Sequence, residues 1–278
     1  MSKSEKSKSE KNQSETSPRK KLPIIIIASL AVVIVAACSI FFLNQRFNFF
    51  SFNQPMQIKV GHSMFEYPPL HYHQDGELVG FDIELAGEVA KIINAEFDFI
   101  QIDWSRAAEL LESGEVDMLW GGLERASLDE RVIRFTRSYL RSDIVLLMRS
   151  DRDYNAFEDL QGLNVCALNF TPAFNYLQVL NRDIIRSQRS FTPPEYQSLL
   201  SALSSDEFDA MITDTSFASF FLRANSGESF RMSDTLIASN YAVAVRIDDT
   251  ELFDLLQGAL DELEANGTIG QLREKWIG

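Results

Sequence analysis

Apolar and polar positions divide the chain into a polar start, one long apolar run and a region of alternating periods. Apart from Met1, residues 1–21 carry no large apolar side chain. Such a stretch cannot bury enough surface to offset the entropy of ordering, so we expect a disordered tail. Residues 22–43 then contain no charge. At about 1.5 Å of rise per residue they can cross a hydrocarbon core about 30 Å thick, which predicts a transmembrane helix.

Charged and aromatic residues on either side of the apolar run indicate its orientation. Arg19, Lys20 and Lys21 lie directly before it, whereas residues 47–52 beyond it are rich in phenylalanine. Positive charge favours the cytoplasmic side, and aromatic rings suit the membrane interface. We therefore expect a single-pass protein of the cytoplasmic (inner) membrane. Its tail is cytoplasmic, residues 44–55 form a juxtamembrane linker, and the large domain is extracytoplasmic, either periplasmic or at the cell surface.

Two outcomes stay open for the apolar run. Val35-Ala36-Ala37-Cys38 resembles the lipobox of bacterial lipoproteins, in which lipid is attached to the cysteine after the signal segment is cleaved. Cys38 is therefore a candidate lipidation site. The long polar tail and the apolar residues 39–43 favour an uncleaved anchor instead. The other cysteine, Cys166, lies in an apolar strand-like run, so we expect no disulfide.

Beyond residue 55, strand-like and helix-like periods alternate, which is typical of an α/β domain with largely parallel sheets. Apolar residues recur at helical spacing over 81–93, and Asp75-Gly76 is a turn pair that closes a hairpin. Short apolar runs predict strands over 56–60, 97–102, 116–120, 144–148, 165–168, 208–213 and 241–245. Further helices are expected over 106–111, from Thr171, around residue 199, and over 251–264 and 269–276.

Charge and the absence of motifs narrow the function. The net charge is −14 at pH 7, and the first 46 residues are net positive, so the domain that follows is more acidic still. We therefore expect no nucleic-acid partner. The motifs of serine hydrolases, zinc proteases, P-loop proteins and dinucleotide-binding enzymes are missing, so we expect no enzyme activity and no cofactor. His71 and His73 lie on one side of a strand without a third ligand, so we expect no metal site.

Five motifs, taken in order, resemble the amino-acid type (family 3) extracytoplasmic solute-binding proteins of ABC transporters. They are VGHSMFEYPPLHYHQDGELVGFDIELAGEVA, IDWSRAAELLESGEVDMLWGG, DLQGLNV, FDAMITD and ANGTIGQLREKWIG. Each motif alone is weak, but their order over residues 56–278 is specific.

The resemblance implies a two-lobed type II periplasmic-binding-protein fold over 56–278. Lobe one would comprise 56–139 and 242–278, lobe two would comprise 140–241, and two crossover strands would form the hinge. Ligand would bind in the cleft, and the lobes would close on it.

The resemblance also implies binding residues. Tyr67 and Trp104 match the aromatic clamp of the family, and Gly121 and Gly122 would bring backbone polar groups close to the ligand. Asp214 matches the acid that pairs with a ligand amine. Two of these residues have a structural alternative as well: Trp104 as a core aromatic, and Asp214 as the N-cap of the following helix.

Three departures from the family affect the carboxylate end of the ligand. The family's carboxylate-binding arginine falls on Asp129 here, and the hydroxyl residue that assists it falls on Glu124. In the family's glycine-rich turn this chain has Thr171 followed by Pro172, which has no N–H to donate and suits a helix start.

Two explanations of these departures stay open. Either Arg125 or Arg131 replaces the missing arginine through a shifted loop, or the ligand is not an ordinary α-amino acid. Glu124, Asp129 and Asp214 around one cleft favour a cationic ligand such as a polyamine or a basic amino acid.

The function expected from these observations is a membrane-tethered receptor. It would capture a small polar ligand, an amino acid or a related amine, and deliver it to an ABC permease. The alternative is a sensor or regulatory ectodomain whose closure is read by a membrane signalling partner, and a third reading is a domain that binds nothing.

Overall fold

The computed structural model describes residues 54–125, 128, 131–169, 171–179, 185–191, 196–227 and 229–278. The expected tail, the apolar run with Cys38, and the linker up to residue 53 lie outside these ranges. Pro55–Gly278 forms one compact unit. Within the described ranges, no helix combines the length and the apolar character that crossing a bilayer requires.

A five-stranded mixed sheet organises the first half of the fold, with the strand order β4-β1-β5-β14-β6. Its strands are β1 (Met56–Ser63), β4 (Ala95–Ile102), β5 (Met118–Leu119), β6 (Ile133–Phe135) and β14 (Ala244–Arg246). β1 runs parallel to β4 and β5, whereas β14 runs antiparallel to β5 and β6. The chain thus returns to this sheet near its end, as the resemblance implies.

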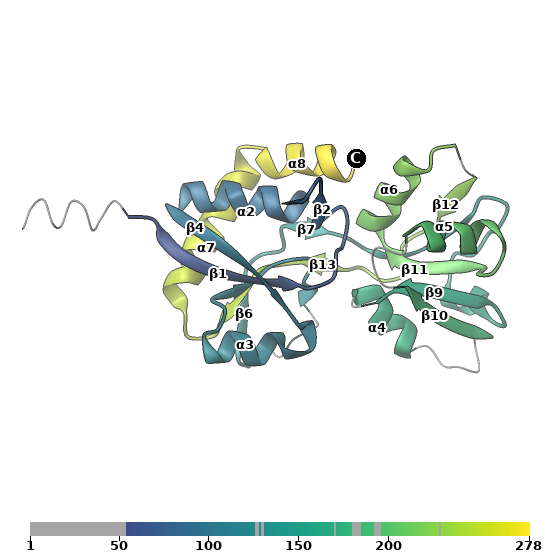
Figure 1. Cartoon of the computed structure of the whole chain (residues 1–278), viewed down its shortest axis with the longest axis horizontal. Coiled ribbons are helices and arrows are strands. Elements are labelled where there is room, and N and C mark those ends of the chain that lie inside the picture. The colour runs from purple at the N-terminus through teal and green to yellow at the C-terminus, as the bar shows by residue number, and fades with distance from the viewer. Residues whose placement is uncertain are drawn as a thin grey trace, which may run out of the picture. The chain divides into compact units, whose positions relative to one another are not determined.

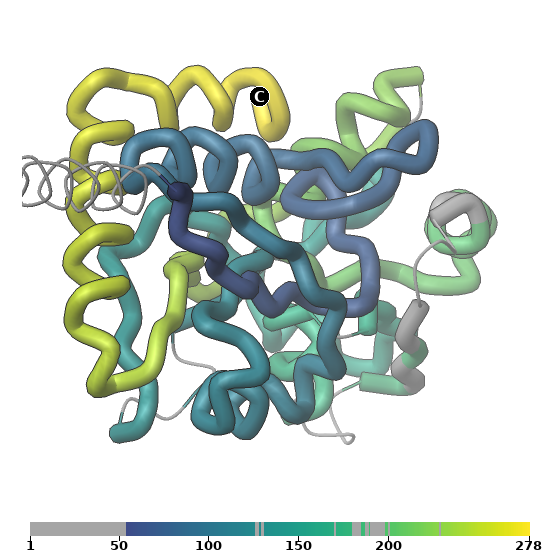
Figure 2. The backbone as a smooth tube through the Cα atoms, turned by 60° about the vertical axis from the view of Figure 1, so that its left-hand side comes forward, coloured from purple at the N-terminus to yellow at the C-terminus, as the bar shows by residue number. Residues whose placement is uncertain are grey.

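Helices at the start and the end of the chain pack together beside this first sheet. α2 (Phe81–Ile92), α7 (Thr250–Ala265) and α8 (Thr268–Trp276) lie side by side (Figures 1 and 2). Phe81, Leu85 and Val89 recur at helical spacing, so they form one buried face of α2. This face belongs to the same core cluster as buried residues of α7 and α8. η1 (Trp104–Arg106) and α3 (Ala107–Ser113) follow β4.

A second five-stranded sheet has the order β10-β9-β11-β8-β12. Its strands are β8 (Ile144–Arg149), β9 (Asn164–Leu168), β10 (Ser187–Phe191), β11 (Ala210–Asp214) and β12 (Phe230–Met232). The helices of this lobe are η3 (Phe157–Leu160), α4 (Pro172–Val179), α5 (Tyr196–Ser204) and α6 (Thr215–Ala224). β8, β9 and β11 are apolar and buried almost throughout, as expected for strands covered on both faces.

Two short strands connect the sheets. β7 (Leu140–Arg141) and β13 (Asn240–Tyr241) pair antiparallel, and the Tyr139 N–H donates to the Tyr241 carbonyl at 3.0 Å. In Figure 1 both strands lie between the two sheets. The chain therefore crosses between the sheets in two paired extended segments, the expected hinge arrangement. A hairpin of β2 (Tyr72–Gln74) and β3 (Glu77–Val79) turns at Asp75-Gly76, where both residues have positive φ, as predicted.

The sheets differ from the expectation in one respect, because they are mixed rather than largely parallel. β8 is antiparallel to both of its neighbours, β11 and β12, and β14 is antiparallel to both β5 and β6. Each follows a hinge strand and so enters its sheet from the hinge side. For the same reason the single strand expected over 241–245 is divided into β13 and β14.

Candidate functional site

A cavity of about 350 Å³ lies where residues of both lobes meet. Its size is within the usual range for a small-molecule site. Most of its lining residues sit in the loops that follow strands or on the first turns of helices. The described lining residues are Ser63, Phe65, Glu66, Tyr67, His71, Trp104, Ser105, Gly121, Gly122, Glu124, Leu128, Asn169, Thr171, Pro172, Phe174 and Asn175.

Tyr67 and His71 form one wall of the cavity. The two residues pair as an isolated β-bridge, which orients both rings from one short loop. The His71 Nε2 lies 3.1 Å from the Phe65 carbonyl oxygen. Burial, together with the neighbouring His62, lowers the pKa of His71 to about 3, so the ring is neutral near pH 7.

Gly121 and Gly122 form a second wall with a conformation that suits glycine. Their φ angles are 144° and 65°. A Cβ on Gly122 would lie 3.0 Å from Leu70 and 3.2 Å from the Tyr67 ring, so the backbone packs closely against these two side chains. The Gly122 N–H donates to the buried Asp82 Oδ2 at 2.8 Å. Burial raises the pKa of Asp82 to about 7, although the Gly122 hydrogen bond opposes that rise.

Glu124 connects three parts of the fold at the cavity. Its Oε1 accepts hydrogen bonds from the Tyr176 hydroxyl on α4 at 3.1 Å and from the Ser239 hydroxyl beside the hinge at 2.8 Å. Its backbone also bridges Tyr241 of β13. A half-buried carboxylate therefore faces the cavity while it joins the loop after β5 to α4 and the hinge.

Thr171 begins α4 at the cavity. Its hydroxyl donates to the Leu168 carbonyl at 2.9 Å and accepts from the Phe174 N–H at 3.2 Å. Pro172 occupies the first helical position, where its missing N–H leaves no hydrogen bond broken. The segment therefore has the geometry of a helix cap, and Thr171 also lines the cavity.

Trp104 lies in η1, directly after β4. The Asp103 carboxylate caps this turn by accepting from the Ser105 N–H at 2.9 Å, which fixes the backbone beside the cavity. The Trp104 side chain is partly exposed and lines the cavity, and it also packs against the apolar cluster of the first lobe.

Asp214, Arg125 and Asp129 are not among the described lining residues. Asp214 is fully buried at the end of β11, where its Oδ1 accepts from the Ser216 and Phe217 N–H groups as the N-cap of α6. Burial raises its pKa to about 7. Arg125 is exposed, and Asp129 lies outside the described residues. The expected ligand contacts of these three residues stay predictions.

Several cavity residues were missed by sequence reasoning, among them Glu66, Asn169 and Asn175. Asn169 follows β9, and the rule that ligands bind beyond the carboxyl ends of parallel strands could have indicated it. Glu66 lies in an aperiodic loop next to Tyr67. Apart from that position, its sequence context gives no signal.

The described residues contain no group of three or more His, Cys, Asp and Glu placed to hold a metal ion. Cys166 is buried within β9, and burial raises the pKa of its thiol well above the usual range. A buried, protonated thiol is chemically inert and belongs to the core.

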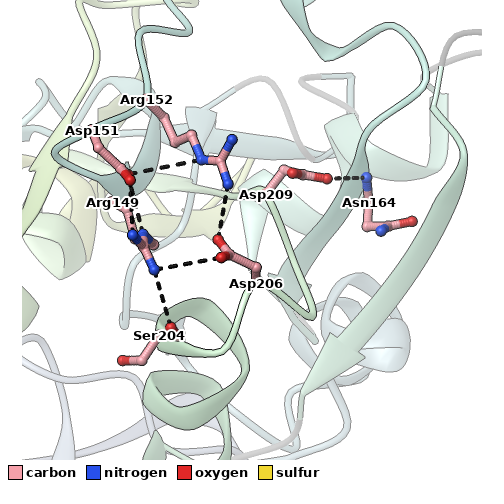
Figure 3. Close-up of polar contacts among 7 residues, drawn as sticks. All are labelled: Arg149, Asp151, Arg152, Asn164, Ser204, Asp206 and Asp209. Atoms are coloured by element: carbon pink, nitrogen blue, oxygen red, sulfur yellow. Dashed lines mark hydrogen bonds and ion pairs between the residues drawn. The ribbon is translucent and has the colours of Figure 1, made fainter.

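A second hollow, of about 410 Å³, lies within the second lobe beside Arg149, Asp151 and Ser204. Its charges are already paired, as Figure 3 shows: Arg149 contacts Asp151 at 2.8 Å and Asp206 at 3.5 Å. Arg152 also pairs with Asp206, at 3.0 Å. This network holds the end of β8 to the α5 region, so we place the functional site in the cavity between the lobes.

The sequence and the fold are similar to those of known binding proteins. Residues 58–278 match the profile of the bacterial extracellular solute-binding proteins, family 3. Among the similar proteins is the arginine-binding extracellular protein ArtP of Bacillus subtilis, 26% identical over 88% of this chain and 96% of the relative. The histidine-binding periplasmic protein of Escherichia coli K12 is 25% identical over 80% of this chain and 88% of the relative.

A solved structure gives the same picture. The P235GK mutant of ArgBP from T. maritima superposes with a TM-score of 0.67 and 26% identity, covering 79% of this chain and 94% of that chain. Residues 55–278 thus have the two-lobed type II periplasmic-binding-protein fold.

Proposed function

We propose a transport role for this chain, which belongs to the bacterial extracellular solute-binding proteins, family 3. The family is non-enzymatic, and the chain is not an enzyme. Its role would be to capture a small organic cation, a basic amino acid or a related amine, and to deliver it to an ABC importer. The observation that carries this proposal is the cavity between the lobes. It presents Glu66 and Glu124, and none of its described lining residues is lysine or arginine.

The similar proteins support a cationic ligand. ArtP of Bacillus subtilis and the ABC transporter arginine-binding protein 1 of Escherichia coli K12 are both named for arginine. In a partly dry cavity a carboxylate strongly favours an opposite charge. The aromatic rings of Tyr67 and Trp104 add faces on which a guanidinium or ammonium group can rest.

The proposal also includes the location of the protein at the inner membrane. The uncharged run over 22–43 would tether the domain to the inner membrane, with the cleft on the extracytoplasmic side. A tethered receptor stays near its permease. The polar tail before that run also favours the alternative of a sensor ectodomain, since a transport receptor does not need one. Deleting the gene for this chain in its host separates the two, because uptake of the ligand then fails only if the chain is a transport receptor.

A ligand panel tests the proposed class. Thermal unfolding of the full-length protein is followed with arginine, lysine, histidine, agmatine and putrescine, and with glutamate, glutamine and succinate. A ligand at about 100 times its dissociation constant adds about 2.7 kcal/mol of stability. We expect only cationic compounds to raise the midpoint. A larger shift with glutamate or succinate than with any cation would contradict the proposal.

A further inference from the structure

Four side chains of the first lobe gather at the end of α8. The Trp276 Nε1 donates to the Glu84 carboxylate on α2 at 2.9 Å, and Lys275 forms an ion pair with the same carboxylate. The ring of Tyr72, on β2, meets the Trp276 ring edge to face, with ring centres 6.2 Å apart at an angle of 87°. These contacts lie within the first lobe, so they hold the Trp276 and Tyr72 rings in position there.

α6 of the second lobe contacts this group of side chains. The Arg223 guanidinium donates to the Trp276 carbonyl, and the centre of the Phe220 ring lies 6.0 Å from that of Tyr72. Phe220 and Arg223 are three residues apart, so they share one face of α6. In Figure 1 the end of α8, marked C, lies beside α6. We call Tyr72, Phe220, Arg223 and Trp276 the α6–α8 contact.

The hinge strands form only a short connection between the lobes. β7 and β13 contain two residues each and pair over that length. Extended segments of this kind absorb changes in φ and ψ, which is how lobes rotate during hinge closure. Contacts away from the hinge can therefore decide which arrangement of the lobes is favoured.

The α6–α8 contact exists in the arrangement in which residues of both lobes line the cavity. In that arrangement Glu124 of the first lobe also accepts from Tyr176 of the second lobe. Tyr72 directly follows His71, which lines the cavity, so α6 is held next to the wall formed by Tyr67 and His71. A rotation that separates the lobes at the cavity would also change the distances across the α6–α8 contact, and hydrogen bonds tolerate little change in geometry.

We propose that the α6–α8 contact is a latch: it favours the arrangement in which both lobes line the cavity, and so it raises ligand affinity without touching the ligand. None of its four residues is among the described residues that line the cavity. The proposal rests on the proposed receptor function and concerns the control of the same site. The apparent affinity of a ligand falls with the fraction of molecules in the arrangement that binds it, and loss of the latch lowers that fraction.

The distance between the lobes tests the latch without any ligand. Glu158→Cys in η3 and Glu262→Cys in α7 place spin labels at exposed positions of the second and the first lobe, in the full-length protein with Cys38→Ala. Cys166 is buried and stays unlabelled. Pulsed electron paramagnetic resonance then gives the distance distribution with and without Arg223→Ala.

We expect Arg223→Ala to shift population away from the main distance of the chain that retains Arg223. Arg273→Ala is the matched control, because it removes the same side chain at another exposed position, on α8. It should leave the distribution unchanged. Identical distributions with and without Arg223→Ala would overturn the latch. Arg223 is itself exposed, so its removal opens no cavity in the core, and the midpoint of thermal unfolding verifies that both variants fold.

Isothermal titration calorimetry with arginine measures the consequence for binding. Loss of one hydrogen bond across the lobes lowers the population of the binding arrangement, so we expect Arg223→Ala to weaken arginine binding about threefold and Arg273→Ala to leave it unchanged. Equal affinity of Arg223→Ala and wild type would overturn the proposal even where the distances differ. If arginine does not bind to the wild type, that result counts against the proposed ligand class, while the distances still decide whether the latch exists.

Discussion

Tyr176 shows how one hydroxyl can link ligand binding to the arrangement of the lobes. It donates to Glu124 at 3.1 Å from the opposite lobe. Tyr176→Phe removes this charge-assisted hydrogen bond without changing the ring. Because the site is partly exposed, we expect a loss of about 1 kcal/mol, which weakens binding of the best ligand about fivefold.

Calorimetry with the best ligand of the panel measures this change in the dissociation constant. Tyr154→Phe removes the hydroxyl of a half-buried tyrosine in the same lobe that does not line the cavity, and it should leave the affinity unchanged. Equal affinity of Tyr176→Phe and the wild type would show that the hydrogen bond to Glu124 contributes nothing to binding.

Asp214 gives a prediction about pH. Burial raises its folded-state pKa from 3.8 to about 7, so the stability that its protonated form contributes is fully present below pH 3.8 and is lost as pH rises through 7. Asp214→Asn keeps an oxygen for the α6 cap but has no charge to desolvate. We therefore expect the stability of the variant, relative to wild type, to be more favourable at pH 8 than at pH 5, with each pKa unit worth about 1.4 kcal/mol.

Urea unfolding at both pH values gives the two free-energy differences. Asp82 and the histidines are the same in both proteins, so their titration cancels. Asp249→Asn is the control. It changes the N-cap of another helix, α7, and the Asp249 side chain is partly exposed rather than buried. A difference between Asp214→Asn and wild type that is identical at pH 5 and pH 8 would mean that Asp214 is not held protonated by burial.

At the scale of elements, the start of α4 can be tested by a pair of substitutions. Thr171→Ala removes the side-chain acceptor of the Phe174 N–H and should lower the free energy of unfolding by about 1 kcal/mol. Thr171→Ser keeps the hydroxyl and should lose much less. The comparison uses urea unfolding without ligand. Equal losses in the two variants would show that packing of the threonine methyl group, rather than the cap, stabilises α4.

The elements with a strong period were predictable from sequence, and the elements set by tertiary contacts were not. α2 and β9 follow their apolar patterns to within a residue or two, because burial of one face or of the whole strand dictates them. β10 and β12 were missed. Their sequences, SQRSF and FRM, lack an apolar period, and both form edges of the second sheet. The division of residues 241–245 depends on the hinge, which no local pattern encodes.

The cavity residues also divide into those that the sequence indicates and those that it does not. Tyr67, Gly121 and Gly122 were predicted from motifs that lie in order along the chain, and all three line the cavity. Tyr176 lies one helical turn after Pro172 and therefore on the same face of α4. It could have been found from that spacing once Pro172 was placed at the cavity. Glu66 and Ser239 depend on loop conformation, which the sequence alone does not fix.

At the scale of the whole molecule, the two lobes contact each other at the cavity and also between α6 and α8. Glu124 and Tyr176 meet at the cavity, while the Arg223 guanidinium donates to the Trp276 carbonyl and the rings of Tyr72 and Phe220 lie 6.0 Å apart. Within the described residues, polar and aromatic contacts thus join the lobes beside the hinge strands, and a ligand in the cavity, which residues of both lobes line, can add to them.

The apolar run before the domain leads to a prediction about attachment to the membrane. Residues 22–43 contain no charge, whereas the polar tail before them is longer than a cleaved signal usually carries, so we expect the apolar run to stay attached to the mature protein. Cys38→Ala should then remain in the membrane fraction after an alkaline wash, and the intact mass should include the tail. Cys166→Ala controls for the loss of a cysteine.

If the mature chain instead begins at Cys38 and incorporates a labelled fatty acid that Cys38→Ala loses, the anchor is a lipid. Either anchor would hold the acidic domain at the membrane by its N-terminal side and would leave the cavity free to exchange ligand.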